Sequence, residues 1–280
     1  MTAAGRRRSA RSVVSPRGMW SKRTPWSWPR RVTSLIIGTA VVAFALWAWG
    51  RVASLDTANQ ARDPIIRWEY VFLREETPAM LWARTVEHLQ LTVIPVAIGL
   101  AISALLALVT RRFRWSLAPV TVFASFLYTI PSFALFALLL TYTTNWIAAV
   151  TALTSYTLLI LVRNIVAGLD GVPEHVLDAA DGLGMSPTRR LLTVEIPLAL
   201  PVIFTGIRIA VVTVVGLVAI SSIIQLGGLG SLIFDGYGRS YKTLMTLGTV
   251  LSVVLAIVLD FVLDRFGKLA TPWAQRQISR

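Results

Sequence analysis

Residues 170–208 read DGVPEHVLDAADGLGMSPTRRLLTVEIPLALPVIFTGIR, and this stretch organises the rest of the chain. It is charged and is interrupted by glycine and proline, whereas uncharged runs long enough to cross a bilayer lie on both sides of it. A bilayer core about 30 Å thick needs about 20 apolar residues per helical span. Because backbone polar groups in lipid must bond within their own segment, such spans are helices. The pattern predicts an all-α polytopic membrane protein with a polar segment between two spans.

The composition supports a membrane protein. The chain has 280 residues, of which 55% are hydrophobic and only 15% are charged, and it contains no cysteine. A soluble domain needs more surface charge than this. The formal net charge is +13, but basic residues in membrane proteins mostly flank the spans on the cytoplasmic side. We therefore expect the lipid bilayer, and not nucleic acid, to be the partner of these basic residues.

The first 84 residues divide into three parts. Residues 1–31 hold nine Lys or Arg and no acid, which predicts a disordered cytoplasmic tail. Residues 32–50 form an uncharged run that is longer than the core of a signal peptide, so we expect a first span. Residues 51–84 are balanced in charge and are expected to form an extracytoplasmic loop. We place its Trp68, Tyr70 and Trp82 in an interfacial belt, with a cation-binding surface as the alternative.

Five further spans are expected, near residues 86–109, 117–140, 146–167, 198–224 and 244–263. The basic residues at 111–114 and in the tail 269–280 then lie inside with both termini, as the positive-inside rule requires. The chain reads as one added N-terminal span followed by a five-helix core over 85–268. The glycine-rich stretch 225–242 is expected to be an external loop. Glu87 and His88 are expected at the wetted outer edge, without a role.

The segment 170–197 is expected to form two short helices. Pro173 suits a first turn, and Gly184 suits a left-handed cap at the end of the first helix. Ser186 and Pro187 then start a second helix, which we expect Pro197 and Pro201 to end. The apolar stripe of the first helix consists of Val176, Ala179, Ala180 and Leu183.

The first of these helices has the character of a protein-docking element. Its stripe is flanked by Glu174, Asp178 and Asp181, whereas helices that lie on a lipid surface favour Lys and Arg. Alanine allows close approach, which suits a helix laid into a groove of a partner. An ordinary interfacial helix between two spans is the alternative.

The same segment resembles the EAA loop of ABC importer permeases. Asp178-Ala179-Ala180 is followed at the family's spacing by Gly184, and then by Ile196-Pro197. Asp replaces the family's Glu, which shortens the side chain by one methylene. Val and Ile also replace the family's Ile and Leu. The resemblance implies that the segment couples to an ATPase through Val176, Asp178, Ala179, Ala180, Leu183, Gly184, Met185 and Pro197.

Three more stretches are similar to the glycine betaine/carnitine/choline branch of these permeases. They are IPSFALFALL at 130–139, PLALPVIFTGIRIA at 197–210 and GGLGSLIFDG at 227–236. Methionine importers share the GGLG element, so an amino-acid importer remains the alternative. The resemblance covers roughly residues 85–268.

What the resemblance implies is an inner-membrane transporter subunit and not an enzyme. Its partners would be two cytoplasmic ATPases, a second permease (the same or a sister chain) and an extracytoplasmic solute-binding protein. The sequence contains no G-x-x-x-x-G-K-[ST] phosphate loop, so ATP hydrolysis is assigned to another chain. We expect no cofactor, no metal site and no catalytic residue here.

The sequence offers fewer candidates for a gate or a solute pathway than for ATPase coupling. A charge within a span is a candidate functional site, which selects Arg208. The alternative is that Arg208 snorkels to the cytoplasmic interface. Pro131 interrupts a span, and Gly227, Gly228 and Gly230 lie in the external glycine-rich stretch.

Two other classes of protein compete with the importer. A self-contained channel or ion-coupled carrier needs ionisable residues at mid-membrane, and only Arg208 comes close. A membrane-embedded enzyme needs a catalytic cluster, yet His88 and His175 lie far apart in the sequence.

Overall fold

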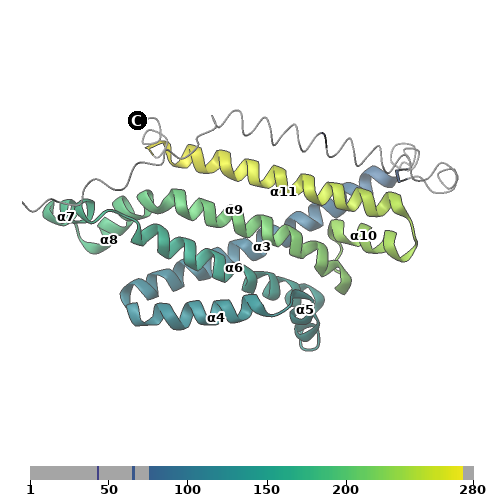
Figure 1. Cartoon of the computed structure of the whole chain (residues 1–280), viewed down its shortest axis with the longest axis horizontal. Coiled ribbons are helices and arrows are strands. Elements are labelled where there is room, and N and C mark those ends of the chain that lie inside the picture. The colour runs from purple at the N-terminus through teal and green to yellow at the C-terminus, as the bar shows by residue number, and fades with distance from the viewer. Residues whose placement is uncertain (1–42, 44–64, 67–75, 274–280) are drawn as a thin grey trace, which may run out of the picture. The chain divides into compact units, whose positions relative to one another are not determined.

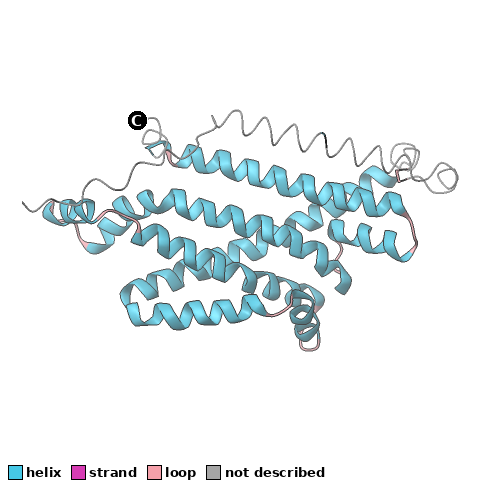
Figure 2. Ribbon diagram, viewed as in Figure 1, coloured by secondary structure: helices cyan, strands magenta, loops and turns pink. Residues whose placement is uncertain are grey.

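The structure is a computed structural model that describes residues 43, 65–66 and 76–273. Contacts divide the chain into two compact units, residues 1–61 and 62–280, and all described residues except residue 43 belong to the second unit. The expected tail 1–31, the first span 32–50 and residues 274–280 lie outside the described residues, apart from residue 43. The described part consists of helices and the loops that connect them, with no strand among the described residues (Figure 2), which confirms the all-α prediction there.

The described residues of this unit form nine α-helices, whose arrangement Figure 1 shows. Two 3-10 turns, Arg114–Ser116 and Ser222–Ile224, and one π turn, Leu191–Glu195, join some of them. The helices are α3 Glu76–Arg112, α4 Leu117–Thr129, α5 Ser132–Leu140, α6 Asn145–Asp170, α7 Glu174–Gly182, α8 Pro187–Arg190, α9 Ile196–Ser221, α10 Gly228–Gly238 and α11 Lys242–Ala270.

Within the described part, four helical runs are long and apolar enough to cross a membrane. They are α3, α6, the run 187–224 and α11, and α4 with α5 gives a fifth if that bent pair is counted as one span. These runs cover the five expected core spans. The prediction that the loop beginning at residue 51 extends to residue 84 is wrong, because α3 begins at Glu76. Met80 and Leu81 pack against a buried cluster on α10 and α11, so burial extends the helix beyond the bilayer-length run.

The core lies where α6 packs against α3 and α9. Leu91 of α3, Leu153 of α6 and Val214 of α9 are fully buried in one cluster. Lipid tails are as apolar as these side chains, so close packing, rather than the hydrophobic effect, holds spans together. The packing between α6 and α9 is tight: a Cβ at Gly206 would lie 2.4 Å from Cβ of Asn164.

The expected third span is broken, not merely kinked. The axes of α4 and α5 differ by 90° at Ile130-Pro131. Pro131 has no N–H and restricts the residue before it to extended conformations, and Ile130 has ψ 128°. The Tyr156 hydroxyl of α6 donates a hydrogen bond to the carbonyl of Ile130, which satisfies a group that the break exposes. Pro131 itself is exposed.

The prediction of a loop over residues 225–242 is also wrong, because α10 occupies much of this stretch. Leu229 and Leu232 of α10 are buried with Leu244 of α11. Their spacing of three residues places them on one helical face. This burial outweighs the poor helix propensity of the glycines.

Pro197 and Pro201 do not end a helix. Helix runs without interruption from Pro187 to Ile224, through the π turn that lies directly before α9. In this turn the N–H of Ile196 bonds to the carbonyl of Leu191. The wider turn shifts the hydrogen-bond register just before Pro197, and proline has no backbone N–H that could donate a helical hydrogen bond. The polar segment is therefore joined rigidly to α9.

Candidate functional site

The segment between α6 and α9 begins with α7, which ends as the sequence predicts. Gly184 has φ +73°, a conformation that costs residues with a Cβ about 1 kcal/mol or more. Its N–H donates to the carbonyl of Asp181 at 2.9 Å, and the N–H of Met185 donates to that of Ala180 at 3.2 Å. This is the Schellman pattern, which satisfies the last carbonyls of a helix. Pro173 precedes the helix as its N-cap and not as its first residue.

The expected apolar stripe of α7 is divided between two faces. Ala180 is buried and Val176 is partly buried. Asp178 and Ala179 are exposed, and Leu183 is 78% exposed. An exposed leucine beside alanine and a carboxylate, on a short helix at the end of the bundle, is suited to a docking face.

The second short helix also starts as predicted. The Ser186 side chain accepts a hydrogen bond from the backbone N–H of Arg189 at 3.4 Å, and Pro187 occupies the first turn. The cap therefore fixes α8 directly after Gly184, so α7 and the long helix that contains α9 are separated by only a few residues.

A chain of ion pairs ties this segment to two membrane helices. Glu195, in the π turn, is 1% exposed, and its Oε1 accepts from Nε of Arg190 at 3.0 Å. Arg190 also pairs with Asp181 of α7, and Glu195 also pairs with Arg111 in the last turn of α3. The resulting chain, Asp181–Arg190–Glu195–Arg111, is here called the joint network. It connects α7 to both α9 and α3.

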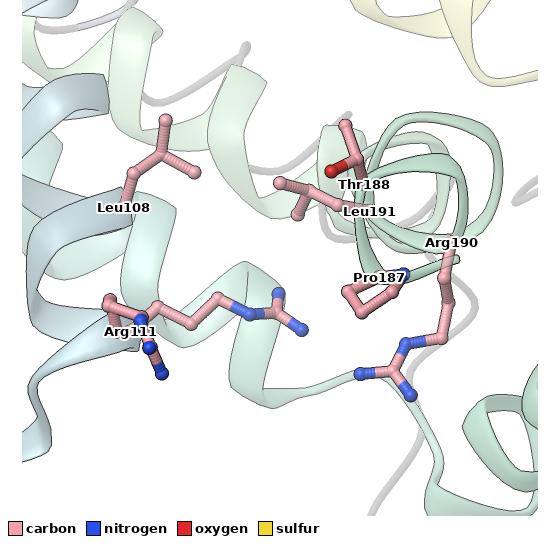
Figure 3. Close-up of a pocket in the computed structure, with 7 residues that line it drawn as sticks. Leu108, Arg111, Pro187, Thr188, Arg190 and Leu191 are labelled. Carbon is pink, nitrogen blue, oxygen red and sulfur yellow. The ribbon is translucent and has the colours of Figure 1, made fainter.

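Two further features lie at the same end of the bundle. Arg114, after α3, donates to both carboxylate oxygens of Asp170 at the end of α6, each at 3.1 Å. A cavity of about 280 Å³ lies between the end of α3 and α8. Figure 3 shows Arg111 reaching from α3 toward Pro187 and Arg190. Three arginines border this cavity, with Leu108, Pro187, Thr188 and Leu191; they are Arg111, Arg112 and Arg190.

Arg208 forms ion pairs between helices. Its Nε and Nη2 each donate at 2.8 Å to one carboxylate oxygen of Asp260, and its Nη1 donates at 2.8 Å to Asp264. Both acids belong to α11, and Lys268 also pairs with Asp264. Such fork-like pairing fixes direction as well as charge. The side chain lies in partly exposed ion pairs that join α9 to α11, beside a cavity of about 500 Å³ that it lines together with Thr205, Ile209, Val212, Thr213 and Asp260.

The glycine element starts α10 against α3. Gly227 has φ +80°, and the N–H of Gly228 donates to Oε2 of Glu87 at 2.9 Å. Nδ1 of His88 accepts from the N–H of Leu229 at 3.2 Å, while Nε2 lies 3.1 Å from the carbonyl of Val215. His88 is fully buried, so the expectation of a wetted edge is wrong for this residue, whereas the side chain of Glu87 is 42% exposed. A Cβ on Gly230 would lie 2.2 Å from the carbonyl oxygen of Ala219, so α10 also touches α9 closely.

The predicted residues therefore occupy separate places. The structure brings together Val176 to Met185 in and after α7, and Gly227 to Gly230 at the start of α10. Arg208 and Pro131 lie in neither group. Among the described residues, no three His, Cys, Asp or Glu side chains gather as metal ligands.

Sequence reasoning missed three residues of this architecture. Glu195 and Asp260 are lone acids within or beside apolar runs, which is a signal that the sequence contained. Asp260 also shows that Arg208 is not the only charge within a span. His88 lies within the expected span 86–109, but nothing in the sequence indicates its partners, which are backbone groups more than a hundred residues away.

The chain is similar to a described protein family and to several known proteins. Residues 94–275 match the model of the family described as binding-protein-dependent transport system inner membrane component. The osmoprotectant import permease protein OsmW of Salmonella typhimurium is 41% identical over 67% of this chain and 90% of its own length. The glycine betaine/carnitine/choline transport system permease protein OpuCB of Bacillus subtilis is 32% identical over 72% of this chain and 93% of its own length.

A solved structure shares the fold. The inward-facing MetNI methionine ABC transporter contains a chain that superposes with a TM-score of 0.62, covering 71% of this chain and 99% of that chain. The sequence identity is 24%, so this likeness bears on the fold alone.

Proposed function

Because the chain belongs to the family of binding-protein-dependent transport system inner membrane components, we propose that it imports a small osmoprotectant of the glycine betaine, choline or carnitine type. It is a permease subunit of an ABC importer and not the ATPase. The observation that carries the solute class is the 41% identity to the osmoprotectant import permease OsmW, along 90% of that protein.

The proposed membrane topology has six spans, with the N-terminal span 32–50 added to the five-helix core, and both termini in the cytoplasm. The described helices support the core part of this topology. The polar end that carries α7, α8 and the basic residues Arg111 to Arg114 then faces the cytoplasm, in keeping with the positive-inside rule. Helix α10 and its glycine turn face the outside.

The proposed partners follow from the same division of labour. Two ATPase subunits bind on the cytoplasmic side, a second permease completes the pathway, and an extracytoplasmic protein delivers the solute. The exposed face of α7, with Asp178, Ala179 and Leu183, is the proposed contact for the ATPase. Met185 and Pro197 belong to the same coupling segment but lie partly buried, so they support this face rather than form it.

The transport cycle is alternating access. When the ATPase pair closes on ATP, α7 is displaced with the surface that holds it. The joint network transmits this displacement to α3 through Arg111, and the continuous helix carries it into α9. Because the joint network holds the ends of α3 and α9 together, the two helices rotate together. This rotation opens one side of the pathway while it closes the other.

Two further elements are proposed to act at opposite sides of this pathway. Arg208, with Asp260 and Asp264, holds α9 to α11 on the cytoplasmic side. Gly227, Gly228 and Gly230 form the external turn that contacts the binding protein or gates the entrance. Pro131 sets the break between α4 and α5.

Reconstituted transport tests the proposed solute class. The permease, its ATPase subunit and the cognate binding protein are placed in proteoliposomes, and ATP-dependent uptake of radiolabelled glycine betaine, choline, carnitine and methionine is measured. We expect uptake of at least one quaternary ammonium solute and none of methionine. Uptake of methionine alone would overturn the osmoprotectant proposal and leave the family assignment intact.

A further inference from the structure

The cavity between α3 and α8, shown in Figure 3, is here called the arginine cavity. Its basic lining consists of Arg111 and Arg112 from the end of α3 and Arg190 from α8. Thr188 adds a hydroxyl group, and Leu108 and Leu191 add apolar surface. Nothing in the proposed transport cycle uses this space.

The arginine cavity has one positive charge in excess. Two carboxylates adjoin it, because Glu195 pairs with Arg111 and Arg190, and Asp181 pairs with Arg190. Three guanidinium groups thus face two carboxylates. Arg112 has no carboxylate partner among the described residues; its guanidinium carbon lies 5.8 Å from the centre of the Phe113 ring.

An apolar track leads from the arginine cavity along α3. Leu108, at the cavity, is 43% exposed, Leu105 is 65% exposed and Ile102 is 37% exposed. Spacings of three residues place these side chains on one face of the helix. A ligand in the cavity can therefore extend an apolar tail along the membrane-spanning part of α3.

We propose that the arginine cavity binds the phosphate headgroup of an anionic phospholipid, whose acyl chain lies along Leu108, Leu105 and Ile102. Guanidinium groups pair with phosphate oxygens through two parallel hydrogen bonds. Basic pockets between membrane helices on the cytoplasmic side suit such headgroups. Free inorganic phosphate would fill the charged part but would leave the track unused, so the track selects the lipid.

The bound lipid would bridge the same two elements that the joint network connects. Arg112 and Arg111 belong to α3, and Arg190 belongs to α8. A phosphate held between them adds a second connection between the coupling segment and α3. This inference depends on the proposed cytoplasmic orientation of this end, and it does not depend on the identity of the solute.

Native mass spectrometry of the detergent-purified complex of permease and ATPase tests the site. The complex is stripped of lipid and titrated with dioleoyl phosphatidylglycerol, with dioleoyl phosphatidylcholine as the neutral comparison. The variant is Arg112→Gln, which removes the guanidinium that has no carboxylate partner. The matched control is Arg189→Gln, which removes an exposed arginine of α8 that does not line the cavity.

We expect the first phosphatidylglycerol to bind each permease with higher affinity than phosphatidylcholine does. Arg112→Gln should lower this affinity about fivefold, since one basic group contributes on the order of 1 kcal/mol toward binding of anionic lipid. Arg189→Gln leaves this affinity unchanged, and Arg112→Lys restores most of it. Equal effects of the two glutamine variants would overturn the proposal, as would equal affinity for the two lipids. Displacement of the bound lipid by inorganic phosphate at the same concentration would also overturn it.

Discussion

Arg111, in the last turn of α3, forms an ion pair with Glu195, in the π turn that leads into α9. Glu195 is 1% exposed and also accepts a hydrogen bond from Arg190. Arg190 in turn pairs with Asp181 of α7. A single buried carboxylate thus holds the end of one membrane helix, the start of another and the proposed docking helix.

Removal of this carboxylate should uncouple the transporter. Glu195→Gln leaves Arg111 and Arg190 without their shared anion, and loss of one partner from a buried ion pair costs about 3 kcal/mol. We expect a lower melting temperature and fewer solute molecules imported per ATP hydrolysed. The ATPase should still co-purify, because the exposed face of α7 is intact.

The control for this variant is Asp170→Asn. It breaks the pair with Arg114 at the same end of the bundle, but both partners of that pair are largely exposed. Exposed pairs contribute little, so coupling should stay near the wild-type value. If the two variants impaired coupling equally, loss of charge at this end would explain the effect, and the joint network would not.

Two glycines of the coupling segment should respond in opposite ways. Gly184→Ala forces a Cβ into φ +73°, at a cost of about 1 kcal/mol. Gly182→Ala, two residues earlier and inside α7, should instead stabilise the helix by about 1 kcal/mol. A Cβ at either position meets no atom within 4 Å, so only the backbone distinguishes them.

Co-purification of the ATPase with tagged permease measures this effect. Gly184→Ala should reduce the amount recovered, and Gly182→Ala should retain or increase it. Equal recovery with both variants would show that the left-handed cap does not set the docking position of α7.

The pair between α9 and α11 should show compensation. Arg208→Gln leaves Asp260 without its guanidinium partner and is expected to lower thermal stability and uptake. In the double variant Arg208→Gln/Asp260→Asn the uncompensated carboxylate is also removed, so part of the stability should return. Thermal unfolding in detergent checks this, and simple additivity of the two single effects would contradict direct pairing.

The start of α10 should tolerate no side chain at Gly227. A Cβ there would lie 2.3 Å from Oε2 of Glu87, in a backbone with φ +80°, so Gly227→Ala should displace Glu87 from the N–H of Gly228. Gly238→Ala at the other end of α10 is the control, because a Cβ there meets no atom within 4 Å. Uptake with the binding protein present should fall only in the first variant.

Much of the fold follows from the sequence because the bilayer restricts it. The lengths of the uncharged runs place the core spans, and Gly184 and Ser186-Pro187 predict the caps on either side of the turn. These signals are local, and each depends on a few neighbouring residues. Local rules therefore predicted the positions of α6, α9 and α11 closely.

The errors arose where contacts distant in sequence decide the structure. Helix α10 replaces an expected loop because Leu229 and Leu232 are buried against α11. His88 is buried because backbone groups of Val215 and Leu229 bond to its ring. Pro197 fails to end a helix because a π turn precedes it. Neither composition nor spacing reports such contacts in advance.

The most direct test of the account is ATP-dependent uptake of glycine betaine, choline or carnitine by proteoliposomes that contain the permease, its ATPase and the binding protein. The prediction is that uptake requires ATP and the ATPase subunit, and that Gly184→Pro abolishes it by disrupting the end of α7. Equal uptake by liposomes that contain the permease alone, without ATP, would show a self-contained channel or carrier and would contradict the account.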